Sequence, residues 1–309
     1  MSKRDLAQVK ECFAIRHFAD FVVVLGKYLS VFSVSGDMQY CQRNICYPYE
    51  VARIGADLLL VRAVKNYYLL TIKDGSIVWS VRKSNQPTFP KHFAVTSSGN
   101  FAYDGYSAIG GFYLVELDLL AATKREYKIP ARAHAISDIF CDANGNPCVL
   151  QHQLIEPERS DRSTNSIICL HNGDIAWENT WTFSDGISAF SFFGDTDTVL
   201  THDLKLYHVP NKIMTDLLSN ETQWKAPKKW ISAVNMDASG RYMTIKYQHS
   251  NAVVDLSEHR VVAQYAAQSK GIVIGNSFWI GSNEGVCIEP FPIMEEIPGD
   301  KYVSWSPFR

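Results

Sequence analysis

The sequence lacks any long hydrophobic run and any excess of charge of one sign. Its best candidate for a membrane span, residues 18–25, contains Asp20 and is far shorter than the roughly 20 apolar residues that a bilayer-crossing helix needs. The formal net charge of −2 over 309 residues provides no general attraction to nucleic acid or to an acidic membrane surface. We therefore expect no membrane insertion and no general binding of nucleic acid.

Paired cysteines are also lacking. The seven cysteines are odd in number and scattered, and the nearest two, Cys41 and Cys46, are five positions apart, so the sequence contains no CxxC pair. The first ten residues include no apolar run long enough for a secretory signal. We expect a cytoplasmic protein with reduced, mostly buried thiols, with no disulfide framework, metal or cofactor.

Helical periodicity is almost absent. Only the first ten residues and residues 212–223 could contain a helical turn. Elsewhere short runs of β-branched and aromatic residues, such as residues 21–25 and 58–61, alternate with Gly, Asn, Asp and Ser. This pattern is typical of strands joined by tight turns, and it predicts an all-β protein.

A repeated element organises these strands. A small residue beside a bulky one, as in Phe13-Ala14-Ile15, recurs with starts near residues 13, 51, 93, 135, 187, 231 and 271. Most copies are followed by a turn such as residues 237–240 and then by a second apolar strand. Later in the repeat, residues 73–79 and 171–177 match almost position for position as Gly-x-Ile-x-Trp hairpins. Spacings of about 40 to 50 residues are those of four-stranded propeller blades.

These segments resemble known propeller families in architecture. Residues 230–242 resemble the inner hairpin of WD-repeat propellers, and the Gly-x-Ile-x-Trp hairpins resemble those of quinoprotein-like propellers. No repeat carries the Gly-His and Trp-Asp signatures of the WD family. The resemblance implies a β-propeller of about seven four-stranded blades, and by itself it assigns no function.

One domain is expected to span residues 1–309. No linker rich in Pro, Gly or Ser divides the chain, the repeat continues throughout, and 46% hydrophobic residues suffice for a substantial core. The alternative is two separate domains. In a single propeller we expect the N- and C-terminal chain to close the ring, with residues 10–18 and 301–308 as strands of one composite blade.

Propeller geometry collects the connections that enter the first strands on one face, together with the loops that follow the second strands. In this sequence those connections are rich in basic and aromatic residues, and the longest insertion is predicted as a loop at residues 153–165. Aromatic and Arg side chains are enriched in the energetic centres of protein interfaces. The residues that we expect to contact a partner are Tyr49, Lys91, His92, Arg132, His134, Arg159, Arg162, Trp181, Lys228, Lys229 and Trp230.

Catalytic and metal patterns have simpler interpretations as turns. Residues 105–110 lack the Gly-x-Ser-x-Gly spacing of a nucleophile elbow, and residues 142–146 lack the closing Glu of a calcium loop. His152 and His202 occupy equivalent places in adjacent repeats, with Asp104 and Asp203 as further candidates, but no third equivalent histidine follows. Because zinc needs three or four converging ligands, we predict no metal site.

The leading functional hypothesis is therefore a non-enzymatic propeller that binds another protein on its loop-rich face, as a scaffold, an adaptor or an inhibitor. The alternative is an enzyme, or a binder of a small ligand or metal, with its site at the mouth of the central channel near His152 and His202. A nucleic-acid adaptor would use residues 228–230, but acidic residues such as Glu156 and Asp161 share the same loops.

Overall fold

The computed structural model describes residues 4–6, 9–82, 92–95, 101–108, 111–119, 121–129, 135–156, 159–172, 174–184, 189–221, 231, 233–247, 251–265, 270–291 and 303–305. Within these ranges the regular secondary structure is entirely β, and the two segments considered for helical turns contain the strands β1 (Arg4–Leu6) and β21 (Ile213–Asp216). Among the described residues no helix is long and apolar enough to span a bilayer.

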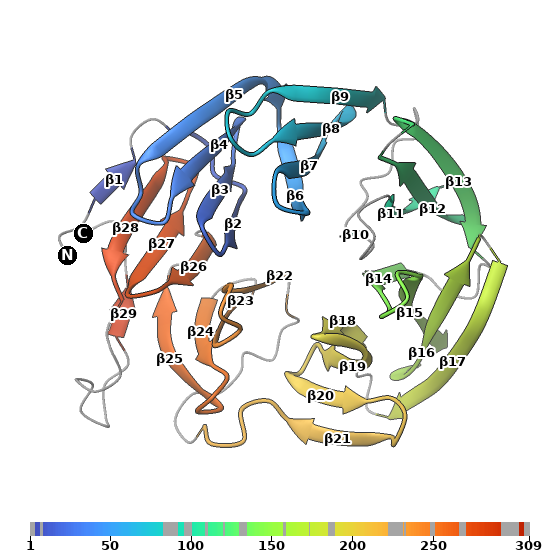
Figure 1. Cartoon of the computed structure of the whole chain (residues 1–309). Coiled ribbons are helices and arrows are strands. Elements are labelled where there is room, and N and C mark those ends of the chain that lie inside the picture. The colour runs from blue at the N-terminus through green and yellow to red at the C-terminus, as the bar shows by residue number, and fades with distance from the viewer. Residues whose placement is uncertain are drawn as a thin grey trace. The chain divides into compact units, whose positions relative to one another are not determined.

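The strands form seven sheets, and the chain divides into two compact units, residues 1–78 with 217–309 and residues 79–216. In the first unit the sheets are β2 (Ala14–Phe18), β3 (Phe21–Leu25), β4 (Tyr28–Ser33) and β5 (Met38–Cys46); β6 (Pro48–Ile54), β7 (Leu58–Ala63), β8 (Asn66–Thr71) and β9 (Ile77–Arg82), whose end extends into the second unit; β22 (Ala233–Met236), β23 (Tyr242–Lys246), β24 (Asn251–Asp255) and β25 (Arg260–Tyr265); and β26 (Lys270–Ile274), β27 (Ser277–Gly281) and β28 (Val286–Pro290) (Figure 1).

The second unit holds the other three sheets. They are β10 (His92–Val95), β11 (Phe101–Ala108), β12 (Gly111–Asp118) and β13 (Thr123–Ile129); β14 (Ala135–Cys141), β15 (Pro147–Glu156), β16 (Arg159–His171) and β17 (Asp174–Ser184); and β18 (Ala189–Phe193), β19 (Asp195–Thr201), β20 (Lys205–His208) and β21. The predicted repeat starts are confirmed, because each lies on or within a few residues of the first strand of a sheet.

The sheets stack face to face within each unit, so that their middle strands are buried on both sides. Val22 and Val24 of β3 pack in a cluster with Trp279 of β27, whereas Val23 packs with Leu59 of β7. Alternate side chains of a strand point to opposite faces, which explains why β3 is a continuous apolar run rather than an alternating one. First strands of successive sheets are neighbours, in the order β22, β26, β2 and β6 in the first unit and β10, β14 and β18 in the second.

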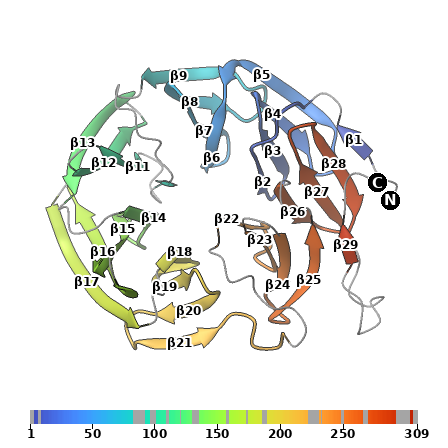
Figure 2. The same ribbon diagram turned by 180° about the vertical axis from the view of Figure 1, so that it is seen from behind.

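The strands near the two ends of the chain join other sheets than the single composite blade that was predicted. Residues 14–18 form β2, the first strand of its own sheet, and it is β1 that pairs antiparallel with β28. Strand β29 (Val303–Trp305) pairs parallel with β25 (Figure 2). The expected composite blade of residues 10–18 with 301–308 is therefore wrong in its strands. A strand is present within residues 10–18, at residues 14–18, but local sequence did not show which sheet it would join.

The predicted loop at residues 153–165 is also wrong, because its described residues extend a β-hairpin. Strands β15 and β16 remain paired from Cys148 opposite Cys169 out to Glu156 opposite Arg159, and β17 follows β16 along most of this length. Polar and charged residues fill the segment, which favoured a loop interpretation, yet backbone pairing between neighbouring strands does not require apolar side chains.

Candidate functional site

The residues expected to contact a partner are only partly within the described chain. Lys91, Arg132, His134, Lys228, Lys229 and Trp230 lie outside it. His92 lies at the start of β10, and Arg159 and Arg162 lie on β16. Tyr49 and Trp181 are the two whose side chains have described surroundings, and these surroundings differ sharply.

Trp181 belongs to a packed aromatic cluster of the second unit. Its indole is only 8% exposed and lies 5.5 Å from the Tyr207 ring in a stacked arrangement, with Phe183 edge-on at 6.1 Å. These rings join the sheets that contain β17 and β20, in the same cluster as Leu150. We therefore assign Trp181 to the core rather than to a partner surface.

Tyr49 lies beside an exposed aromatic rim. The guanidinium of Arg62 lies 5.8 Å from the Tyr49 ring, and the rings of Phe13 and Tyr47 lie 6.1 Å apart with 37% and 42% of their surfaces exposed. Tyr47 has a φ of 52°, an uncommon value for a residue with a side chain, and its amide donates to the carbonyl of Lys27 at 3.0 Å. The rim is thus held in place by the backbone at the entrances to β2 and β6.

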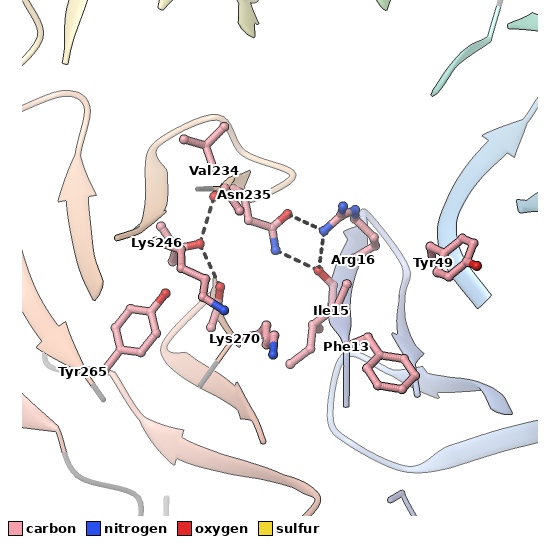
Figure 3. Close-up of a pocket in the computed structure, with 13 residues that line it drawn as sticks. Phe13, Ile15, Arg16, Tyr49, Val234, Asn235, Lys246, Tyr265 and Lys270 are labelled. Carbon is pink, nitrogen blue, oxygen red and sulfur yellow. Dashed lines mark hydrogen bonds between the residues drawn. The ribbon is translucent and has the colours of Figure 1, made fainter. Parts of the chain in front are cut away.

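A cavity of about 380 Å³ opens next to this rim, within the first unit (Figure 3). Its walls come mainly from the first strands β2, β22 and β26 and from the second strand β23. The lining residues are Phe13, Ala14, Ile15, Arg16, Tyr49, Ala233, Val234, Asn235, Thr244, Lys246, Tyr265, Lys270 and Gly271. This volume lies in the range of small-ligand sites, which are mostly apolar with a few convergent polar groups.

One wall of the cavity is a hydrogen-bonded network centred on Arg16. Its guanidinium makes a bidentate ion pair with Glu50, with Nε–Oε1 at 2.9 Å and Nη2–Oε2 at 3.0 Å, and its Nη1 donates to Asn235 Oδ1 at 3.2 Å. The Asn235 amide in turn donates to the carbonyl of Ile15 at 2.8 Å (Figure 3). The network links the first strands of three sheets, β22, β2 and β6.

The ion pair keeps both of its groups charged. Burial favours the neutral forms, but the mutual attraction and hydrogen bonds outweigh it, so the pKa of Glu50 is held below its ordinary value and that of Arg16 is raised. The charge of Arg16 is therefore committed to Glu50.

Two lysines supply further positive charge to the cavity. Burial lowers the pKa of Lys246, and the nearby ammonium of Lys270, within hydrogen-bonding reach, lowers it further. Burial raises the pKa of the Cys12 thiol to about 12, although the positive charge of Lys270 lowers it. Like charges placed this close make the region electropositive.

Sequence reasoning missed Arg16, Asn235, Lys246 and Lys270. The available signal was a charged residue within or at the end of the first or second strand of a sheet, at Arg16, Lys246 and Lys270. Neither His152 nor His202 is among the described lining residues of the cavity. The His202 ring packs edge-on against Phe190 at 4.9 Å.

Asp203, the further ligand candidate beside His202, serves a turn. It accepts a hydrogen bond from the Thr201 hydroxyl at 2.5 Å and pairs with Lys205 at 3.1 Å. Both partners of Asp203 are therefore side chains of its own turn.

The described residues also include one group with metal-ligand chemistry, Asp142, Cys148 and Cys169, whose ligand atoms lie within 4.8 Å of one another. The Asp142 carboxylate already accepts hydrogen bonds from the backbone amides of Asn144 and Asn146 at 2.9 and 2.8 Å. Burial raises the pKa of Cys148 and of Cys169. This arrangement is that of a turn cap beside protonated core thiols, and the prediction of no metal stays a prediction.

Comparison with known proteins identifies the fold. No family model and no curated protein matches the sequence. The structure is similar to a Kuenenia stuttgartiensis hydrazine synthase chain, with 10% identity, a TM-score of 0.65 and coverage of 91% of this chain and 96% of that one. It is also similar to the β-propeller domain of Myceliophteria thermophila Cps50 (Swd1), with 12% identity, a TM-score of 0.65 and coverage of 94% and 100%. The predicted resemblance to WD-repeat propellers is confirmed at the level of the fold: this all-β chain has a β-propeller architecture.

Proposed function

We propose that the protein is a non-enzymatic β-propeller that binds another protein, as a scaffold, an adaptor or an inhibitor, on the face where the chain enters the first strands. The observation that carries the proposal is the exposed aromatic rim of Phe13 and Tyr47 beside Tyr49. Large aromatic rings that are held rigidly and left partly exposed bury much area at modest entropy cost, which is what energetic centres of interfaces use.

A complete propeller would supply the rest of this face. In this proposal the seven sheets are the blades of one domain over residues 1–309, and β1 closes the ring by completing the sheet of β26 to β28. The entering connections that carry Lys91, Arg132 and Lys228 are further candidates for contact with the partner in this proposal. A cytoplasmic location accords with seven free cysteines.

The experiment compares partner capture by matched variants. The double variant Phe13→Ala/Tyr47→Ala removes the rim, and Val34→Ala is the control, because Val34 is 44% exposed in the turn between β4 and β5 at the opposite end of the same sheet. We expect proteins captured from the native host by the wild type to be captured equally by Val34→Ala and to be lost with the double variant. The dissociation constant measured with the purified partner should rise at least tenfold.

Melting temperatures provide the check on folding. Phe13 and Tyr47 are exposed, so the double variant should melt within a few degrees of the wild type. Equal binding by a well-folded double variant would contradict the proposal, as would the absence of any specific partner. The alternative function of small-ligand binding is favoured by a separate observation, the cation-lined cavity.

A further inference from the structure

The cavity beside the rim is a built site rather than a chance gap. The Thr244 hydroxyl lies 2.8 Å from the carbonyl oxygen of Gly271 and 3.1 Å from that of Asn235, which ties β23 to both β26 and β22. Tyr265 lines the same wall, and burial raises the pKa of its hydroxyl, which lies close to Thr244 and to the Gly271 backbone. These contacts hold the wall that carries Lys246 and Lys270 in one arrangement.

Gly271 makes this arrangement feasible. A Cβ atom at this position would lie 2.5 Å from the Phe278 ring and 3.2 Å from the Tyr265 ring. Neither ring can retreat easily, because Phe278 is fully buried and packs edge-on against Tyr265 at 5.2 Å. The close approach brings the backbone of β26, and with it Lys270, against the neighbouring strand β23.

The charged residues that line the cavity are all positive. Its thirteen described lining residues include three cations, Arg16, Lys246 and Lys270, and no carboxylate. Glu50, which is not among the lining residues, accepts hydrogen bonds from Nε and Nη2 of the Arg16 guanidinium. The ammonium groups of Lys246 and Lys270 repel each other because they lie close together in a partly desolvated site. An anion placed between them would be attracted by both.

The remaining lining defines the rest of the ligand. Phe13 and Val234 offer apolar surface, and the Tyr49 ring adds an aromatic wall. A ligand with an anionic head and a small apolar or aromatic body fits this distribution, and the volume of about 380 Å³ suits a small molecule.

We propose that this cavity binds a small organic oxyanion, a carboxylate or a phosphate ester, with the charged group between the ammonium groups of Lys246 and Lys270 and the apolar body toward Phe13 and Tyr49. This activity goes beyond protein binding and does not depend on it, since the charged end of the site lies on β23 and β26 and not on the rim.

The test measures binding by calorimetry and by ligand-induced change in melting temperature at low ionic strength. The probes are phenyl phosphate, benzoate and inorganic phosphate, with benzyl alcohol as the neutral analogue and chloride as the ionic-strength control. We expect saturable binding of phenyl phosphate and benzoate, weaker binding of inorganic phosphate because it lacks the apolar body, and none of benzyl alcohol.

Variants assign the binding to the two lysines. Lys246→Met and Lys270→Met should each weaken phenyl phosphate binding at least tenfold, whereas Lys73→Met, which removes an exposed lysine of the same unit, should leave it unchanged. Lys246→Arg keeps the charge and should retain most of the affinity. A melting curve of each variant checks that it folds.

Several results would overturn the proposal. They are no saturable binding of any anionic probe, equal binding by the lysine-to-methionine variants, or equally strong binding of benzyl alcohol. Binding of a hexaglutamate peptide without binding of the small anions would assign the site to an acidic protein segment instead. Partner capture by the rim variants is a separate measurement, so either proposal can fail while the other stands.

Discussion

The side-chain amide of Asn235 on β22 donates a hydrogen bond to the backbone carbonyl of Ile15 on β2, at 2.8 Å and across 220 positions of the chain. The same side chain accepts from Arg16 at 3.2 Å. One residue thus bridges strands from the two distant chain segments that make up the first unit, and it couples the wall of the cavity to the stability of that unit.

Replacement of Asn235 by Ala should destabilise the protein. Loss of the amide leaves the Ile15 carbonyl without this donor and removes one acceptor of Arg16, and partly buried polar groups that lose a partner cost about 1–3 kcal/mol each. The measurement is the free energy of unfolding in urea. Asn44→Ala, at an exposed position of β5, is the control and should change it by less than about 0.5 kcal/mol. A loss no larger for Asn235→Ala than for Asn44→Ala would contradict the bridging role.

Glu50→Gln should destabilise the protein in a way that depends on pH. The pKa of Glu50 is lower in the folded state than in the unfolded state, so its carboxylate contributes stability above its unfolded pKa, and this contribution is lost as the pH falls through the folded pKa. At pH 7 we expect a loss of about 2 kcal/mol or more, because the Arg16 charge stays partly buried without its partner.

The pH profile distinguishes this ion pair from a packing effect. The difference in unfolding free energy between Glu50→Gln and the wild type should shrink as the pH is lowered below about 4.3. Glu284→Gln, at an exposed turn position, should show no comparable difference at any pH. A constant difference from pH 7 to pH 3 would indicate that the charge of Glu50 is not what stabilises the fold.

The two tryptophans of β17, Trp177 and Trp181, should differ in how much stability is lost when each is replaced by alanine. Trp181→Ala removes an 8%-exposed ring from an aromatic cluster and should cost about 3–5 kcal/mol. Trp177→Ala, four positions earlier on β17 with the ring 39% exposed, should cost less than about 1 kcal/mol. Urea unfolding of both variants provides the comparison. A small loss of unfolding free energy for Trp181→Ala, together with impaired partner capture, would show that Trp181 belongs to the binding face.

The cysteines should divide by reactivity toward a thiol reagent in the native protein. Cys46 is exposed and should be labelled first, whereas Cys12, Cys148 and Cys169 are fully buried and burial raises the pKa of each. Mass spectrometry of the protein after short exposure to iodoacetamide identifies the modified residues. Rapid modification of Cys148 or Cys169 without unfolding would show that their sheet opens readily.

Local sequence was sufficient to predict the strands, their repetition and the propeller fold. Runs such as residues 58–61 and turns such as residues 237–240 act over a few positions, and both lie where they were expected. The predicted loop at residues 153–165 failed because backbone pairing can continue through polar residues, so polarity did not mark the end of the hairpin.

The candidate site could not be predicted in this way. Arg16, Asn235 and Lys270 lie on first strands of three different sheets, and each looks like an ordinary polar residue in its own segment. Trp181 resembled a binding aromatic for the same reason, since its burial depends on Tyr207 of the next sheet.

The sequence by itself therefore determined most of the strands and turns and the β-propeller class, because strand and turn preferences are short-range and recur with the repeat. Only the tertiary structure decided the cation-lined cavity, the Arg16–Glu50 pair and the strands that the ends of the chain join. These depend on contacts between residues far apart in the chain, such as Ile15 and Asn235, and such contacts arise from the packing of whole sheets rather than from any local pattern.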